Sequence, residues 1–251
     1  MIYLRSAEEI EKIRKAGIIV AQCYKEIGNF IRPGISTLKI DKLVEEIISK
    51  HGARPAQKGY SGYPYATCAS VNDGVCHCFP NNNPLVDGDI VTIDMVVELD
   101  GWMADSAWSF EVGTVSEDAK KLLEVTKKSL YLGIEQAQIG NRIGDISFAI
   151  QQYAESNGFS VVKDFVGHGI GKSMHEEPQV PHYGNPKRGQ RIIEGMVFTI
   201  EPMINAGDYS IKIDDNNNWD ARTLDGSLSA QYEHTIAITK DGPVILTCLD
   251  A

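Results

Sequence analysis

The chain has 251 residues and a formal net charge of −10, with 43% hydrophobic and 23% charged residues. This composition is ordinary for a soluble globular protein, and the negative charge argues against direct binding to nucleic acid. No apolar run approaches the roughly 20 residues of a membrane span, so we expect no membrane partner. The acidic start does not look like a signal peptide, and the five cysteines lack a framework spacing. We therefore expect reduced thiols and a cytoplasmic location.

Four helices are predicted, in two pairs. Ser6 followed by Glu9 forms a capping box that opens the first helix. The second helix begins near Ser36 and carries apolar residues at i, i+3, i+4 spacing. Two further helices are expected at roughly 117–138 and 144–157. Runs of β-branched and apolar residues follow each pair and predict strands there.

The strand segments after the two helix pairs resemble each other. Gly88–Asp94 corresponds to Gly195–Glu201 at a constant separation of 107 positions, and three residues of the preceding helical segments match at 106 positions. Two matches in the same order predict an internal repeat, with halves of about 1–112 and 113–251. We therefore expect one α+β domain, residues 1–251, whose pseudo-symmetric halves each place two helices on an antiparallel sheet.

A predicted hairpin brings two carboxylates together. Asp100-Gly101 between apolar runs indicates a two-residue loop. That loop pairs Asp105 with Val96, so Asp94 lies on the same face, one diagonal step from Asp105. A solvated strand face would be the simpler explanation, but Asp94 follows the run Ile90–Ile93, which is typical of a central strand where an unpaired charge is costly. Two buried like charges need a cation between them, and a metal ion is the simplest.

Further candidate metal ligands lie in the second half. His168 and His175 stand on a segment with alternate glycines, which cannot form a stable helix and can approach another backbone closely. A lone histidine is more often structural, but two on such a segment favour metal or acid–base chemistry. Glu201 ends one strand that looks buried, and Glu233 lies on another. Strand alternation turns His234 to the face opposite Glu233. Four carboxylates and one imidazole carry more negative charge and provide more ligands than a single zinc site uses. They suit two divalent ions about 3.5–4 Å apart.

Five ordered motifs resemble those of type I methionine aminopeptidases, from about residue 3 to the end of the chain. The motifs are Ser70-Val71-Asn72 with Cys76-His77, Gly167–Gly171, His175–Pro178, Thr199–Pro202 and Ala230–His234. The resemblance implies the pita-bread (creatinase/aminopeptidase) fold. It also implies the metal ligands Asp94, Asp105, His168, Glu201 and Glu233.

The same resemblance implies a reaction, the removal of N-terminal methionine from peptides and nascent proteins whose second residue is small. Two divalent ions, of cobalt, manganese, iron or zinc, would activate the attacking water. Glu201 is expected to shuttle a proton, His175 to stabilise the oxyanion and His77 to contact the scissile amide. The methionine side chain is expected to bind Tyr60, Tyr63, Cys68 and Trp219. The family also implies a monomer, with ribosome-associated nascent chains among its substrates.

The chain departs from the family pattern in a few places and leaves two alternatives open. The departures are Gln57, Ala104, Ser106 and Met174. None of them removes a ligand, so they bear on side-chain preference and rate. One alternative is another pita-bread hydrolase, such as an X-Pro peptidase, although the large N-terminal domain of those enzymes is missing. The other is a non-catalytic peptide-binding module, which would predict a lost ligand or a lost His175.

Overall fold

The computed structural model describes residues 1–249, in which four α-helices and antiparallel sheets alternate along the chain. The helices are α1 (Ala7–Phe30), α2 (Thr37–Lys50), α3 (Glu117–Gln136) and α4 (Ile143–Ser156), with a short 3-10 turn η1 (Tyr60–Gly62). The first strands are β1 (Arg54–Pro55), β2 (Cys68–Val71), β3 (Gly74–Cys76), β4 (Ile90–Leu99) and β5 (Trp102–Glu111). The later strands are β6 (Ser160–Val161), β7 (Gly167–Gly169), β8 (Glu176–Val180), β9 (Val197–Ile200), β10 (Met203–Asn205), β11 (Ile211–Ile213), β12 (Ala221–Thr223), β13 (Ser229–Gln231), β14 (His234–Thr239) and β15 (Gly242–Ile245). The predicted α+β class is confirmed.

The helices begin and end where the sequence predicts, within a few residues. At the start of α1, the Ser6 hydroxyl accepts from the Glu9 N–H at 3.3 Å, and the Glu9 carboxylate accepts from the Ser6 N–H at 2.9 Å. This reciprocal pair is the predicted capping box. After α2, Gly52 adopts a φ of +70°, a left-handed conformation that only glycine takes without strain. None of the helices among residues 1–249 combines the length and hydropathy that crossing a membrane requires.

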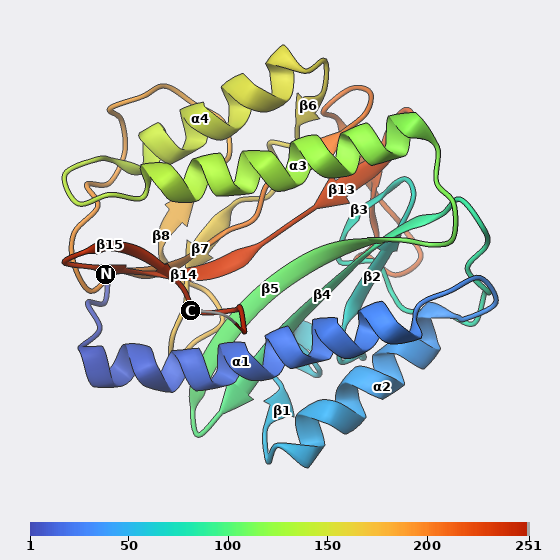
Figure 1. Cartoon of the computed structure of the whole chain (residues 1–251), viewed down its shortest axis with the longest axis horizontal. Coiled ribbons are helices and arrows are strands. Elements are labelled where there is room, and N and C mark those ends of the chain that lie inside the picture. Colours follow the sequence, from blue (N-terminus) through green and yellow to red (C-terminus); the bar gives the residue numbers. More distant parts are fainter. Residues whose placement is uncertain (250–251) are drawn as a thin grey trace.

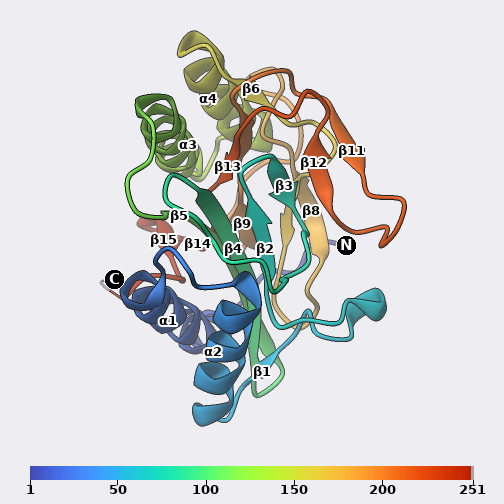
Figure 2. The ribbon, with the colours of Figure 1, turned by 90° about the vertical axis from the view of Figure 1, so that its right-hand side faces the viewer.

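The helices cover one side of the strands. Figure 1 shows α3 and α4 along one end of the sheets and α1 and α2 along the other. In Figure 2 all four helices lie on one side, with β3, β8 and β12 on the opposite side. β4 forms a long hairpin with β5 and pairs along its other edge with β1 and β2. A second, five-stranded sheet has the strand order β15-β14-β9-β7-β8. Two three-stranded sheets have the orders β13-β10-β6 and β11-β12-β3.

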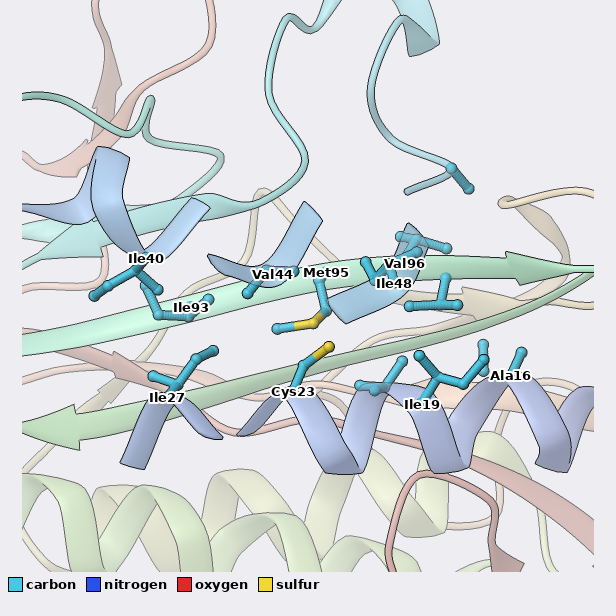
Figure 3. Close-up of a cluster of buried hydrophobic side chains, with 14 of the residues drawn as sticks. Ala16, Ile19, Cys23, Ile27, Ile40, Val44, Ile48, Ile93, Met95 and Val96 are labelled. Atoms are coloured by element: carbon cyan, nitrogen blue, oxygen red, sulfur yellow. The ribbon is translucent and has the colours of Figure 1, made fainter. Parts of the chain in front are cut away.

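Two buried apolar clusters hold these layers together. The first lies between α1, α2 and β4, where Cys23 and Ile27 of α1 approach Val44 of α2 and Met95 of β4 (Figure 3). The second joins α3 and α4 to the later strands, with Phe198 of β9 fully buried at its centre. Each fully buried side chain of this size contributes about 1.5–3 kcal/mol. The strands that carry the candidate site therefore rest on rigid support from both helix pairs.

Matching glycines in the two halves share an unusual backbone conformation. The φ angles are +90° and +96° at Gly34 and Gly140, and +98° and +85° at Gly88 and Gly195. These are the pairs on which the sequence repeat depends. Their agreement supports an internal duplication with halves of about 1–112 and 113–251, which stays a prediction.

Candidate metal centre and active site

The hairpin of β4 and β5 has the predicted register. Asp105 lies opposite Val96, and the loop residues Asp100 and Gly101 have φ angles of +51° and +79°. Positive φ at both positions is the geometry of the two-residue loop that Asp-Gly favours. Asp94, two positions from Val96, therefore shares a sheet face with Asp105.

Groups from three other segments of the chain converge on these two aspartates. Carboxylate oxygens of Asp94, Asp105 and Glu233 lie within 4.8 Å of one another. The Nε2 atom of His168 lies 3.7 Å from a carboxylate oxygen of Asp105 and 3.6 Å from one of Glu201. All five predicted ligand side chains thus lie in one place. They come from the β4–β5 hairpin, from β7, from the end of β9 and from the residue before β14.

The glycines around His168 allow this convergence. A Cβ atom at Gly167 would lie 2.5 Å from the Thr199 carbonyl oxygen, and one at Gly169 would lie 2.2 Å from the Glu177 carbonyl oxygen. Both separations are impossible for a real side chain, so only glycine lets β7 fit between β9 and β8. The close backbone approach expected from the sequence is present, and it fixes where His168 lies.

The carboxylates form a donor set that fits a cation. The Oδ1 atom of Asp105 and the Oε1 atom of Glu233 are buried and have no hydrogen-bond partner. Burial raises the pKa of Asp94 to about 7 and that of Glu201 to about 8. Burial, and then the neighbouring carboxylates, raise the pKa values of Asp105 and Glu233 well above their ordinary range. Unpartnered, mutually repelling carboxylates of this kind are what a divalent cation neutralises.

His168 has the protonation state that a metal ligand needs. Its Nδ1 atom lies 3.0 Å from the carbonyl oxygen of Gly169, so Nδ1 carries the hydrogen and donates it. Nε2, which lies near Asp105 and Glu201, is then left with a free lone pair. Burial, reinforced by His175, lowers the pKa of His168 to about 4. The imidazole is therefore neutral near pH 7, and a backbone acceptor sets its orientation, an arrangement that is common among histidines that bind metal.

Two residues to which the sequence assigned no individual role hold Glu201 in place. The Thr199 hydroxyl donates to Oε1 of Glu201 at 2.7 Å and accepts from the His168 N–H at 2.9 Å. The Nε2 atom of fully buried His182 accepts from the Glu201 N–H at 3.0 Å. Thr199 could have been found, because residues two apart on a strand share a face. His182 carried no such signal.

All the predicted site residues border one cavity of about 540 Å³. They are Tyr60, Tyr63, Cys68, His77, Asp94, Asp105, His168, His175, Glu201, Trp219 and Glu233. Tyr63 and Cys68 are buried, and the ring of Tyr63 meets that of Trp219 edge-on at a centroid distance of 5.0 Å. His77 lies edge-on between Phe165 and Trp219, at centroid distances of 5.1 and 6.2 Å. The cavity thus joins a carboxylate-rich region to an aromatic one.

His175 lies at the rim, next to the carboxylate-rich region. Its ring centroid is 4.3 Å from that of His168, and its Nδ1 atom is 3.0 Å from the hydroxyl of Tyr60. Partial burial lowers the pKa of His175, and burial lowers that of His77 to about 4. Both imidazoles are therefore neutral near pH 7 and available for hydrogen bonding.

The departures from the family pattern fall into two groups. Gln57 and Met174 border the cavity, whereas Ala104 and Ser106 lie behind it in the packed hairpin. Oε1 of Gln57 accepts from the Val96 N–H at 2.7 Å, which leaves its amide nitrogen 3.5 Å from the sulfur of Cys68. Of the four departures, only Gln57 and Met174 can contact a side chain bound in the cavity.

Comparisons with known proteins agree with this geometry. The pattern of metallopeptidase family M24 matches residues 11–240. The methionine aminopeptidase of Clostridium perfringens is 50% identical over 249 residues, which cover 99% of this chain and 100% of that protein. A crystal structure of methionine aminopeptidase from Rickettsia prowazekii, 43% identical, matches with a TM-score of 0.97 over 98% of this chain and 100% of that one. Prolidase from Pyrococcus furiosus shares the fold at 22% identity, with a TM-score of 0.80 over 99% of this chain and 66% of that one.

The chain therefore belongs to metallopeptidase family M24. As a member of this family it uses a divalent metal and acts on peptides. The predicted pita-bread fold and the resemblance to methionine aminopeptidases are confirmed by the same matches.

Proposed function

We propose that this chain removes N-terminal methionine from peptides and nascent proteins whose second residue is small. The observation that carries this function is the convergence of five side chains of metal-binding type beside an aromatic-walled cavity. Full-length similarity to proteins named methionine aminopeptidase supports this activity over that of an X-Pro peptidase, to which the similarity is far lower. The presence of every ligand and of His175 argues against a non-catalytic module.

The centre is proposed to hold two divalent ions. Four carboxylates and one imidazole provide more ligands than one ion needs, and the group of Asp94, Asp105 and Glu233 extends through His168 to Glu201. Ions bound there would supply Lewis-acid polarisation of the scissile carbonyl and would lower the pKa of water. Carboxylates with one imidazole accept manganese, iron, cobalt or zinc.

The protein side chains have separate proposed roles in the reaction. Glu201 takes the proton of the attacking water and passes it to the leaving amine, with its carboxylate oriented by Thr199. We propose that the Tyr60 hydroxyl, 3.0 Å from Nδ1 of His175, donates to it, so that Nε2 carries the hydrogen and donates it to the developing oxyanion. His77 contacts the scissile amide from the aromatic side of the cavity.

The aromatic region is proposed to bind the methionine side chain. Tyr63, Cys68 and Trp219 enclose space for one unbranched apolar side chain, and exposed Tyr60 closes it at the rim. Cys23, Cys68, Cys76 and Cys78 are free, buried thiols, which suits a reducing compartment such as the cytoplasm. We propose that the enzyme works there as a monomer, with ribosome-associated nascent chains among its substrates.

The test is hydrolysis of three tripeptides after chelation and again after divalent metal is restored. Metal-dependent release of methionine from Met-Ala-Ser, with Met-Leu-Ser and Ala-Pro-Ser intact, is the expected result. Cleavage of Ala-Pro-Ser alone would assign the chain to the X-Pro peptidases. No cleavage with any metal, in a protein that still binds one, would indicate a non-catalytic module.

A further inference from the structure

The segment before α1 lies against the loop that carries His175. We call residues 2–5 the N-terminal strap and residues 171–176 the His175 loop. Ile2 forms an isolated parallel bridge with Glu177, and the Arg5 N–H donates to the Gly195 carbonyl oxygen at 2.7 Å. The strap is therefore attached at one end to Glu177, which borders the cavity, and at the other to Gly195, in the turn before β9.

A buried ion pair joins the strap to the loop. The guanidinium of Arg5 donates to Oε2 of Glu176, and each side chain is only 7% exposed. The other oxygen of Glu176, Oε1, accepts from the N–H groups of Lys172 and Ser173, both at 3.1 Å. One carboxylate thus closes the turn of the His175 loop and ties that turn to the strap.

The site around Arg5 is built to admit its side chain. A Cβ atom at Gly171 would lie 2.5 Å from the guanidinium, and one at Gly195 would lie 3.0 Å from the Arg5 carbonyl oxygen. The guanidinium also lies over the ring of Trp102, at 5.4 Å from its centroid. Gly171 and the face of Trp102 therefore admit the guanidinium, and Gly195 admits the backbone of Arg5.

His175 depends on the backbone of this loop for its position. Its side chain is exposed at the cavity rim, where it contacts the Tyr60 hydroxyl and the ring of His168. Glu176 is the next residue along the chain, so a shift of the Glu176 backbone moves His175 as well. The carboxylate of Glu176 is in turn held by Arg5.

We propose that Arg5 is a positioning residue that acts through Glu176 to hold His175 where it meets the developing oxyanion. The inference rests on the proposed function, because it assumes that His175 has that role. Without Arg5, the Glu176 carboxylate loses its buried partner and turns towards water. The turn then loosens, and His175 leaves its catalytic position while the metal ligands and the methionine pocket stay in place.

The first experiment compares R5A, R5K and R14A in hydrolysis of Met-Ala-Ser. R5A is expected to lower kcat by about 10- to 100-fold, the scale of a misplaced catalytic group, with a much smaller change in KM. R5K, which keeps the charge but not the planar fork, should lie between R5A and wild type. Arg14, which pairs with Glu11 on the exposed face of α1, is the matched control, and R14A should leave kcat unchanged. Manganese affinity, measured by calorimetry, should be the same in all four proteins.

A second experiment separates positioning from general destabilisation. If Arg5 acts through His175, adding R5A to H175A should cause no further loss of kcat. An equal loss in both backgrounds, or a wild-type kcat in R5A, would overturn the proposal. If R5A does not fold, a wild-type kcat in R5K would overturn it instead. Absence of methionine release by the wild-type protein, or full kcat in H175A, would instead refute the proposed function or the role of His175, and with it the basis of this inference.

Discussion

Replacing Thr199 with valine tests whether the hydrogen bond to Glu201 matters for metal binding. Thr199 is fully buried, and its hydroxyl donates to the Glu201 carboxylate at 2.7 Å. Valine keeps the shape but not the donor, so the charged form of Glu201 loses a hydrogen bond of about 1.5–3 kcal/mol. The pKa of Glu201 then rises further, and protons compete more strongly with the metal. At 1.36 kcal/mol per tenfold change, affinity for a divalent ion should fall by about 10- to 100-fold.

Calorimetric titration of manganese into T199V, T199S and wild type measures this loss directly. Serine keeps the hydroxyl, so T199S should retain most of the affinity and isolates the hydrogen bond from the packing of the methyl group. The kcat for Met-Ala-Ser at saturating metal should follow the same order. The reasoning would be refuted if T199V bound manganese as tightly as wild type. It would also fail if T199S lost as much affinity as T199V.

Three further predictions concern the same centre. D105N should abolish both activity and metal occupancy, since Asp105 lies between the other ligand groups; a fully active variant with bound metal, shown by metal analysis, would contradict the ligand assignment. H175A should keep its metal but lose about 10²-fold in kcat, the scale of removing one oxyanion donor, and an unchanged kcat in steady-state assays would exclude that role. In metal-free protein the folded-state pKa values of Asp94 (about 7) and Glu201 (about 8) exceed their unfolded values, so the folded state binds more protons. Stability from these groups is complete below their unfolded pKa values, near 4, and is lost as pH rises from there through 7–8, so the melting temperature should fall over this range and recover on addition of metal.

The sequence predicts the parts of the site that depend on local geometry. A two-residue Asp-Gly loop has one register, so the diagonal relation of Asp94 and Asp105 follows from counting residues. Alternate glycines likewise predict a close backbone approach at His168, which the short distances to Thr199 and Glu177 confirm. In both cases the constraint spans only a few residues along the chain.

Contacts between distant segments are not readable in this way. His182 accepts a hydrogen bond from the backbone of Glu201 and lies in the loop after β8. Arg5 pairs with Glu176 although the two residues are 171 positions apart in the sequence. Their positions depend on how the β7–β8 and β9 segments pack, and these strands are only three to five residues long. Such short strands carry too little hydrophobic periodicity to set their partners or order. The order β15-β14-β9-β7-β8 therefore required the structure.

The wide spacing of the ligands along the chain has a consequence for biosynthesis. Asp94 and Glu233 are 139 positions apart, and His168 and Glu201 lie between them. Because the chain is made from its N-terminus, the β4–β5 hairpin can form before the later ligand residues have been translated. Asp94 and Asp105 are then present on the hairpin without the other three ligand residues. The full ligand set exists only once β14 has been made and has joined its sheet. We therefore expect metal to bind late in maturation, so protein made during metal starvation should accumulate in a folded, inactive form that added metal activates.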